Sequence, residues 1–191
     1  YGVMTPYSNI FCFATTRREG FSKGDYASFN CTPYTGDDAE SVRRNQELLC
    51  NSMPQPPKEL VIPFQTHGTK VEVIDEKYLN ATSDERTVML QGVDALITKE
   101  PGCCICISTA DCIPILLYDC KNQVVAAAHA GWRGTVNYIA GHTLDRMRAL
   151  YGTDGKDVIA CIGPGISLPS FEVGEEVYEA FRMNGFAMDY I

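Results

Sequence analysis

The residues of this chain best suited to chemistry are two histidines and one cysteine: His67, Cys112 and His129. Each adjoins an apolar, strand-like run and has glycine, proline or other small residues beside it. Folds commonly present ligands from such strand ends to one shared pocket. Two imidazoles and a thiolate suit zinc and leave a fourth coordination position for water or substrate. The sequence therefore predicts a metal centre, provided that the fold brings the three residues together.

The remaining histidine, His142, is expected to take no part in such a centre. Its spacing from Val136 and Ile139 places it about 120° around a predicted helix from the apolar stripe, at 100° per residue. We therefore expect His142 to be solvated.

The chain has nine cysteines, an odd number, and several of them lie inside apolar runs. Those in apolar runs are Cys12, Cys103, Cys104, Cys106 and Cys161. A secreted disulfide framework would place cysteines among the loops of a shorter chain, so we expect buried, reduced, structural thiols. Cys103 and Cys106 have a CxxC spacing, but on an extended strand they point to opposite faces and should not chelate together.

Length and composition indicate one soluble domain. The chain has 191 residues, of which 45% are apolar and 21% charged. Its net charge of -8 argues against a general nucleic-acid or anionic-membrane surface. No apolar run approaches membrane-spanning length, so we expect a cytoplasmic protein with no membrane partner and no nucleic-acid partner. The sequence starts at Tyr1, which leaves room for an earlier segment.

Hydrophobic periodicity and turn residues predict the elements that position these side chains. Strands are expected over residues 10–16, 26–30, 59–64, 71–74, 95–98, 103–108, 113–118, 124–128 and 158–162. Helices are expected over residues 39–50, 136–150 and 175–184, and residues 75–92 as a polar, irregular surface excursion. Nothing suggests a linker or a repeat. The prediction is a mixed α/β (α+β) fold: one domain over residues 1–191, with a mixed β-sheet core flanked by helices.

Several motifs occur in one order along the chain. They are QTHG (65–68), TADCIP (109–114), AHAGWRG (128–134), IGPGI (162–166) and FEVGEEV (171–177), with SFN (28–30) and GD (36–37) upstream. Together they resemble the YfiH family, also called the laccase-domain or multicopper polyphenol oxidase family, from about residue 15 to residue 181. The resemblance implies a YfiH-like domain. Relatives continue for several tens of residues beyond the position of Ile191, so we expect the chain to lack their C-terminal segment.

The resemblance implies a zinc-dependent enzyme of purine nucleoside metabolism. Its substrates would be a purine nucleoside and phosphate, with phosphorolysis of adenosine, inosine, guanosine and methylthioadenosine, together with adenosine deamination. It assigns His67, Cys112 and His129 as zinc ligands. The older oxidase label implies copper and phenolic substrates instead. A multicopper centre would need more histidines than the three present, so zinc ranks above copper.

The sequence leaves the roles of four further residues open. Asp111, beside Cys112, is the nearest general acid/base or a structural carboxylate. Arg133 and Arg17 are candidates to hold phosphate, with a salt bridge as the plain alternative for Arg17. Gln65 would orient substrate or pair with backbone.

Two other functions remain alternatives. Cys112, an acidic residue and a nearby histidine would also suit a metal-free cysteine hydrolase. An inactive zinc-binding protein is the non-catalytic alternative. The sequence leaves the oligomeric state open.

Overall fold

The computed structural model describes residues 2–188, which form a five-stranded and a two-stranded sheet. The larger sheet has the order β2 (Lys70–Ile74), β3 (Val93–Thr98), β6 (Val124–Ala130), β5 (Ile113–Asp119) and β7 (Val158–Ile162). β2 and β3 pair in parallel, and the remaining pairs are antiparallel. The smaller sheet pairs β1 (Glu59–Val61) with β4 (Cys103–Ile105) in parallel. The predicted mixed α/β fold with a mixed sheet is therefore confirmed.

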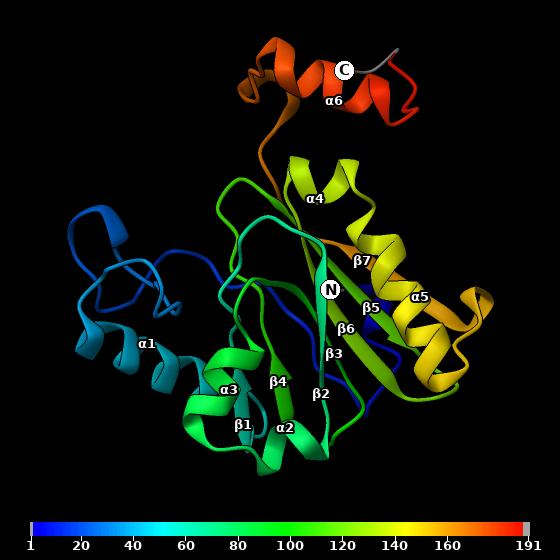
Figure 1. Cartoon of the computed structure of the whole chain (residues 1–191). Coiled ribbons are helices and arrows are strands. Elements are labelled where there is room, and N and C mark those ends of the chain that lie inside the picture. Colours follow the sequence, from blue (N-terminus) through cyan, green and yellow to red (C-terminus); the bar gives the residue numbers. More distant parts are fainter. Residues whose placement is uncertain (1, 189–191) are drawn as a thin grey trace.

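Helix α5 (Ile139–Tyr151) covers one face of the larger sheet, where Met147 packs against Ile97 and Leu117. The opposite face packs Leu96 against Val61 of β1. Because neighbouring residues of a strand point to opposite faces, Leu96 and Ile97 contribute to different cores. Figure 1 shows α5 on one side of the larger sheet, with β1, β4 and α1 (Ala39–Asn51) toward the other side.

The other helices are short and lie around the sheets. They are α2 (Glu76–Asn80), α3 (Ser83–Met89), α4 (Trp132–Val136) and α6 (Glu175–Met183), with 3-10 turns at Gly2–Met4, Gly24–Tyr26, Gly155–Asp157 and Leu168–Ser170. Figure 1 shows α6 on an arm that stands away from both sheets, next to α4. Within residues 2–188, no helix has both the length and the apolar character needed to cross a membrane.

The strongly patterned elements are where the sequence predicts them. The helix over residues 39–50 is α1, which begins after Asp38, whose carboxylate accepts the Ser41 N–H. The strands over residues 113–118, 124–128 and 158–162 are confirmed as β5, β6 and β7. Gly152 ends α5 in the left-handed region at φ 68°, a conformation that glycine adopts without steric cost.

The two predicted N-terminal strands are wrong. Residues 10–16 and 26–30 join neither sheet. Ile10 and Cys12 pack beside the buried Tyr118. Their side chains are therefore apolar because they contact the core, although their backbone joins no sheet. The strands predicted over residues 59–64 and 103–108 are also shorter, because pairing ends at Val61 and Ile105.

Residues 75–92, predicted to be irregular, contain the two helices α2 and α3. Asp75 caps α2 by accepting the Tyr78 N–H at 3.1 Å. Thr82 and Glu85 form a capping box at the start of α3. Tyr78 is buried, which anchors this segment against the core beneath it.

The helix predicted over residues 136–150 begins earlier and is interrupted. α4 starts at Trp132, and Tyr138 then adopts a left-handed conformation at φ 58° before α5 begins. The Tyr138 hydroxyl donates to the Asn184 carbonyl, and its ring stacks on Phe186, so contacts with the C-terminal arm hold the break.

The cysteines agree only in part with the prediction. The eight cysteines from Cys31 to Cys161 carry free thiols, as expected. Of the five expected in the core, only Cys161 is fully buried, and the other four are half-buried. Cys104 and Cys106 share one face, with their sulfur atoms 3.6 Å apart.

Candidate metal centre

His67, Cys112 and His129 converge in the structure. Among residues 2–188 they form the group suited to a metal ion, with all their ligand atoms within 4.8 Å of one another. The two imidazole rings meet edge to face, with centroids 4.8 Å apart. His67 is exposed, Cys112 half-buried and His129 buried, so the group opens to solvent on its His67 side.

Strand pairing brings about this convergence. In the antiparallel pair β5–β6, Pro114 lies opposite His129 and Ile113 opposite Ala130. Cys112 directly precedes Ile113, so its thiol is at the strand end beside His129. His67 belongs to the loop between β1 and β2, at the same end of the sheet. Residues that are far apart in the sequence are therefore brought together because they lie at neighbouring ends of the sheet.

Asp94, which the sequence analysis missed, lies at the centre of this arrangement. Its side chain has no solvent exposure, and Oδ1 lies 2.8 Å from Nδ1 of His129. The same carboxylate accepts the backbone N–H groups of residues 66–68. The available signal was a single acidic residue inside the mostly apolar strand VDALIT. A charged carboxylate buried away from water is stable only when hydrogen-bond donors, here the N–H groups of residues 66–68, surround it.

The electrostatics of the site follow from this packing. Burial raises the pKa of Asp94, but the hydrogen bonds from His129, Gly68 and Thr66 outweigh burial and hold that pKa below its usual value. Burial, and then the charge of Asp111 and Asp94, raises the pKa of the Cys112 thiol. A thiolate at this position therefore needs a neighbouring cation to stabilise it.

The residues fit a metal ion. Because Nδ1 of His129 faces Asp94, Nε2 is the ring atom left to bind a cation. Gly131 is close enough that an added Cβ would lie 3.0 Å from Cys112 Sγ and 3.0 Å from His67 Cδ2. The absence of a side chain at Gly131 keeps the space beside the ligands clear.

Gln65 links the loop of His67 to the segment that precedes Cys112. Its Nε2 donates to the Ser108 carbonyl at 2.9 Å, and its Oε1 accepts the Ser108 N–H at 2.7 Å. Both ends of the amide are thus paired with backbone. This pairing holds the loop that carries His67 against the segment that leads to Cys112.

The other predicted site residues are distributed around the metal group. Asp111 is exposed beside Cys112, and its charge contributes to raising the pKa of that thiol. Arg133 is exposed, and its guanidinium lies 4.2 Å from the centroid of the Trp132 ring. Arg17 donates from Nε and Nη2 to the Ala27 carbonyl, at 3.0 and 2.7 Å.

His142 is exposed on α5 and outside the ligand group, as predicted.

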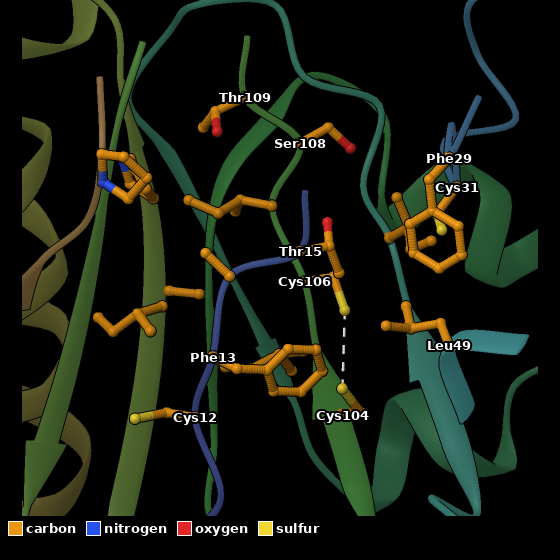
Figure 2. A pocket seen from close by; sticks show the side chains of 18 of the residues that line it. Cys12, Phe13, Thr15, Phe29, Cys31, Leu49, Cys104, Cys106, Ser108 and Thr109 are labelled. Atoms are coloured by element: carbon orange, nitrogen blue, oxygen red, sulfur yellow. Dashed lines mark hydrogen bonds between the residues drawn. The ribbon is translucent and has the colours of Figure 1, made fainter. Parts of the chain in front are cut away.

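A cavity of about 740 Å³ lies between the larger sheet, the smaller sheet and the N-terminal segment. Its lining includes Pro114, the strand partner of His129, and residues 108–111, but none of the three metal-group residues. Figure 2 shows Ser108 and Thr109 toward one end of the cavity, with the Cys104–Cys106 thiol pair further along its wall. Arg17 also lines this cavity. His67, Cys112 and His129 therefore lie next to the cavity and not inside it.

Comparison with known proteins identifies relatives along the whole chain. The chain is 63% identical over 191 residues to a purine nucleoside phosphorylase of Bacteroides thetaiotaomicron, covering 100% of this chain and 71% of the relative. It is 40% identical over 182 residues to adenosine deaminase RL5 of an unknown prokaryotic organism, covering 95% of this chain and 69% of that protein.

Solved structures share the fold. The crystal structure of YlmD from Geobacillus stearothermophilus matches with a TM-score of 0.80 and 31% identity, over 88% of this chain and 63% of that chain. The Bacillus licheniformis protein YfiH matches with a TM-score of 0.79 and 27% identity, over 87% of this chain and 62% of that chain. The chain thus spans less than two thirds of the length of these two solved relatives.

A family profile described as multi-copper polyphenol oxidoreductase laccase matches residues 11–190. With that match over nearly the whole chain and a relative at 63% identity, the chain belongs to this family, to which its motifs also point.

Proposed function

We propose that this chain carries the zinc centre of a purine nucleoside enzyme, with phosphorolysis as its main reaction and adenosine deamination as the second. The observation that carries the proposal is the convergence of His67, Cys112 and His129 beside the cleared space at Gly131. The relatives named purine nucleoside phosphorylase and adenosine deaminase give the substrate class. We also propose that residues 1–191 form one domain.

His67, Cys112 and His129 would hold the metal ion. When bound, zinc supplies a Lewis acid with an open position, at which the pKa of a water is lowered toward neutrality. Zinc is preferred over copper because His142 lies exposed outside the group, which leaves two histidines for the site. Multicopper chemistry needs a larger set of histidine ligands.

Arg133 is the proposed phosphate-binding residue. Its guanidinium is exposed, follows the ligand His129 closely in sequence and lies against Trp132. The ring holds the cation by a cation–π contact and leaves its N–H groups available to phosphate oxygens. In phosphorolysis, a phosphate oxygen bonds to C1′ as the bond from C1′ to the purine breaks, and the purine leaves with the electron pair.

Arg17 is a weaker candidate for phosphate, since two of its donors already bind the Ala27 carbonyl.

Asp111 is the proposed proton carrier. Its carboxylate is exposed beside Cys112 and lines the neighbouring cavity. In deamination, Asp111 would accept a proton from the attacking water and return one to the departing amino group, so that adenosine and water give inosine and ammonia. General acid–base transfer of this kind contributes roughly 10²–10⁴-fold to a rate.

Gln65 is proposed to support the site indirectly, because both ends of its amide already bind Ser108.

The test is to incubate the purified chain with adenosine, with and without phosphate, and to identify the products. Adenine and ribose-1-phosphate, formed only with phosphate, would establish phosphorolysis; inosine would establish deamination. Metal content is measured on the same sample. Zinc binding without either product would remove the nucleoside proposal and leave the metal centre in place.

A further inference from the structure

The buried carboxylate of Asp94 joins the two histidine-bearing segments. Oδ2 accepts the backbone N–H groups of Thr66 at 3.1 Å and Gly68 at 2.7 Å. Oδ1 accepts the backbone N–H of His67 at 3.0 Å and faces Nδ1 of His129 at 2.8 Å. One side chain thus holds the backbone of one proposed ligand and the ring of the other.

The backbone around His67 is shaped for an anion. Three successive N–H groups, of residues 66–68, point at one carboxylate, which is the pattern of a backbone anion-binding nest. His67 adopts φ 62°, a left-handed conformation that is uncommon for residues other than glycine. Such a conformation persists when its surroundings hold it in place. Here the hydrogen bonds from residues 66–68 to Asp94 hold it.

Asp94 also selects the form of the His129 ring. An ionised carboxylate is an acceptor only, so Nδ1 of His129 must carry the proton that points at Oδ1. The lone pair is then on Nε2, the atom left to bind a cation. The other tautomer would place a proton on Nε2 and block it.

We propose that Asp94 is a positioning residue that presets both histidine ligands before a metal ion binds. The inference rests on the proposed metal centre and adds a requirement to it: position 94 must present two oxygen acceptors and no donor. Asp94 itself makes no metal bond in this proposal. Replacing a carboxylate that orients a metal-binding histidine commonly lowers metal affinity by about 10–100-fold.

The Asp94→Asn variant tests this requirement because it exchanges one oxygen for an NH₂ group and keeps the shape. With NH₂ at the Oδ2 position, a donor faces the N–H groups of Thr66 and Gly68. With NH₂ at the Oδ1 position, a donor faces the His67 N–H and turns His129 toward the wrong tautomer. Neither orientation satisfies both segments.

Asp119→Asn is the matched control. Asp119 is also fully buried and accepts backbone N–H groups, from Lys121 and Asn122, but it lies at the far end of β5 from Cys112. Zinc affinity is measured for the wild-type chain and both variants by competition with a chromogenic chelator. We expect Asp94→Asn to bind zinc 10–100-fold more weakly and Asp119→Asn to match the wild type. Equal affinity of all three proteins would overturn the proposal.

A second measurement needs no folded variant at position 94. Nitrogen-15 spectra of the metal-free wild-type ring, assigned with His129→Gln, should show His129 with its proton on Nδ1; a proton on Nε2 would overturn the proposal. The metal centre is tested separately by Cys112→Ala. If Cys112→Ala binds zinc as tightly as the wild type, the centre itself is wrong; if only Asp94→Asn does, the positioning role alone is wrong.

Discussion

The side-chain amide of Gln65 and the backbone of Ser108 form two hydrogen bonds, of 2.9 and 2.7 Å, across 43 residues of sequence. One amide therefore serves as both donor and acceptor for a single backbone unit. The first partner lies two residues before His67 and the second four residues before Cys112. The pair keeps the loops that carry His67 and Cys112 at a fixed separation.

Gln65→Glu should weaken this link. The new oxygen would face the Ser108 carbonyl, which loses a donor and gains a repulsive neighbour. We expect the free energy of unfolding to fall by about 1–3 kcal/mol. Zinc affinity should also fall, because the two loops separate. Denaturant titration and chelator competition measure the two effects.

The control for that change is Gln46→Glu, since Gln46 donates a comparable hydrogen bond to the Cys31 carbonyl, outside the ligand loops. It should lose stability with no change in zinc affinity. If both variants lose affinity equally, Gln65 has no special role.

Gly131→Ala should weaken metal binding with little change in backbone conformation. Gly131 has φ -70°, which alanine adopts readily, but its Cβ would lie 3.0 Å from Cys112 Sγ and from His67 Cδ2. We expect the two ligands to be pushed apart. Gly141→Ala is the matched control at an exposed position of α5, where the nearest atom to a new Cβ is 3.7 Å away. That variant should gain roughly 0.5–1 kcal/mol of stability. Unchanged zinc affinity in Gly131→Ala would contradict the crowding argument.

Cys112→Ala should remove the metal ion and, with it, any nucleoside turnover. Two histidines without the thiolate form an incomplete zinc site. Elemental analysis after gel filtration gives the zinc-to-protein ratio, expected near one for the wild type and near zero for the variant. His142→Ala, which changes an exposed histidine outside the group, should keep the full ratio. Retained zinc in Cys112→Ala would show that other residues bind it.

Asp119 should make stability depend on pH. Burial raises the pKa of Asp119, but hydrogen bonds from Asn122 and from the Lys121 backbone outweigh burial and leave the pKa lowered. Since the folded pKa lies below the unfolded value of about 3.9, the carboxylate stabilises the fold above that pH, and the contribution disappears as pH falls through the folded pKa.

The corresponding measurement compares metal-free wild type with Asp119→Asn by denaturant titration across the acid range. The difference in unfolding free energy should be largest at neutral pH, on the order of 1 kcal/mol, and shrink on acidification. If the difference in unfolding free energy does not change with pH, the Asp119→Asn substitution acts through packing and not through the charge of Asp119.

Elements with a clear period and a cap could be predicted from the sequence. Residues 113–118 form a mostly apolar run that pairs with β6 and β7, and α5 repeats its apolar residues at helical spacing before Gly152. Residues 10–16 have similar apolar character but lack a pairing partner, which periodicity cannot detect. The helices within residues 75–92 carried readable capping signals at Asp75 and Thr82, which the polar composition obscured.

The candidate site divides in the same way. Residue type and strand-end placement point to His67, Cys112 and His129 as candidates, the family motifs group them, and the fold brings them together. The sequence marks Asp94 only as an acidic residue in a mostly apolar run, because its partners lie 26 to 35 residues away and include three backbone groups that carry no sequence signature. Its role exists only once β3 is paired with β6.

Strand alignment has a consequence for the metal centre. Ala128 and Ala130 pack toward Ile139 of α5, so His129 between them points to the opposite face, where Asp94 is. A slip of one residue in β6 would turn the imidazole under the helix and present a methyl group to Asp94. Only one alignment of β6 with its neighbours brings His129 together with His67 and Cys112. Metal uptake would thus report correct strand registration during folding, and misaligned chains would be recognisable as those that fail to bind metal.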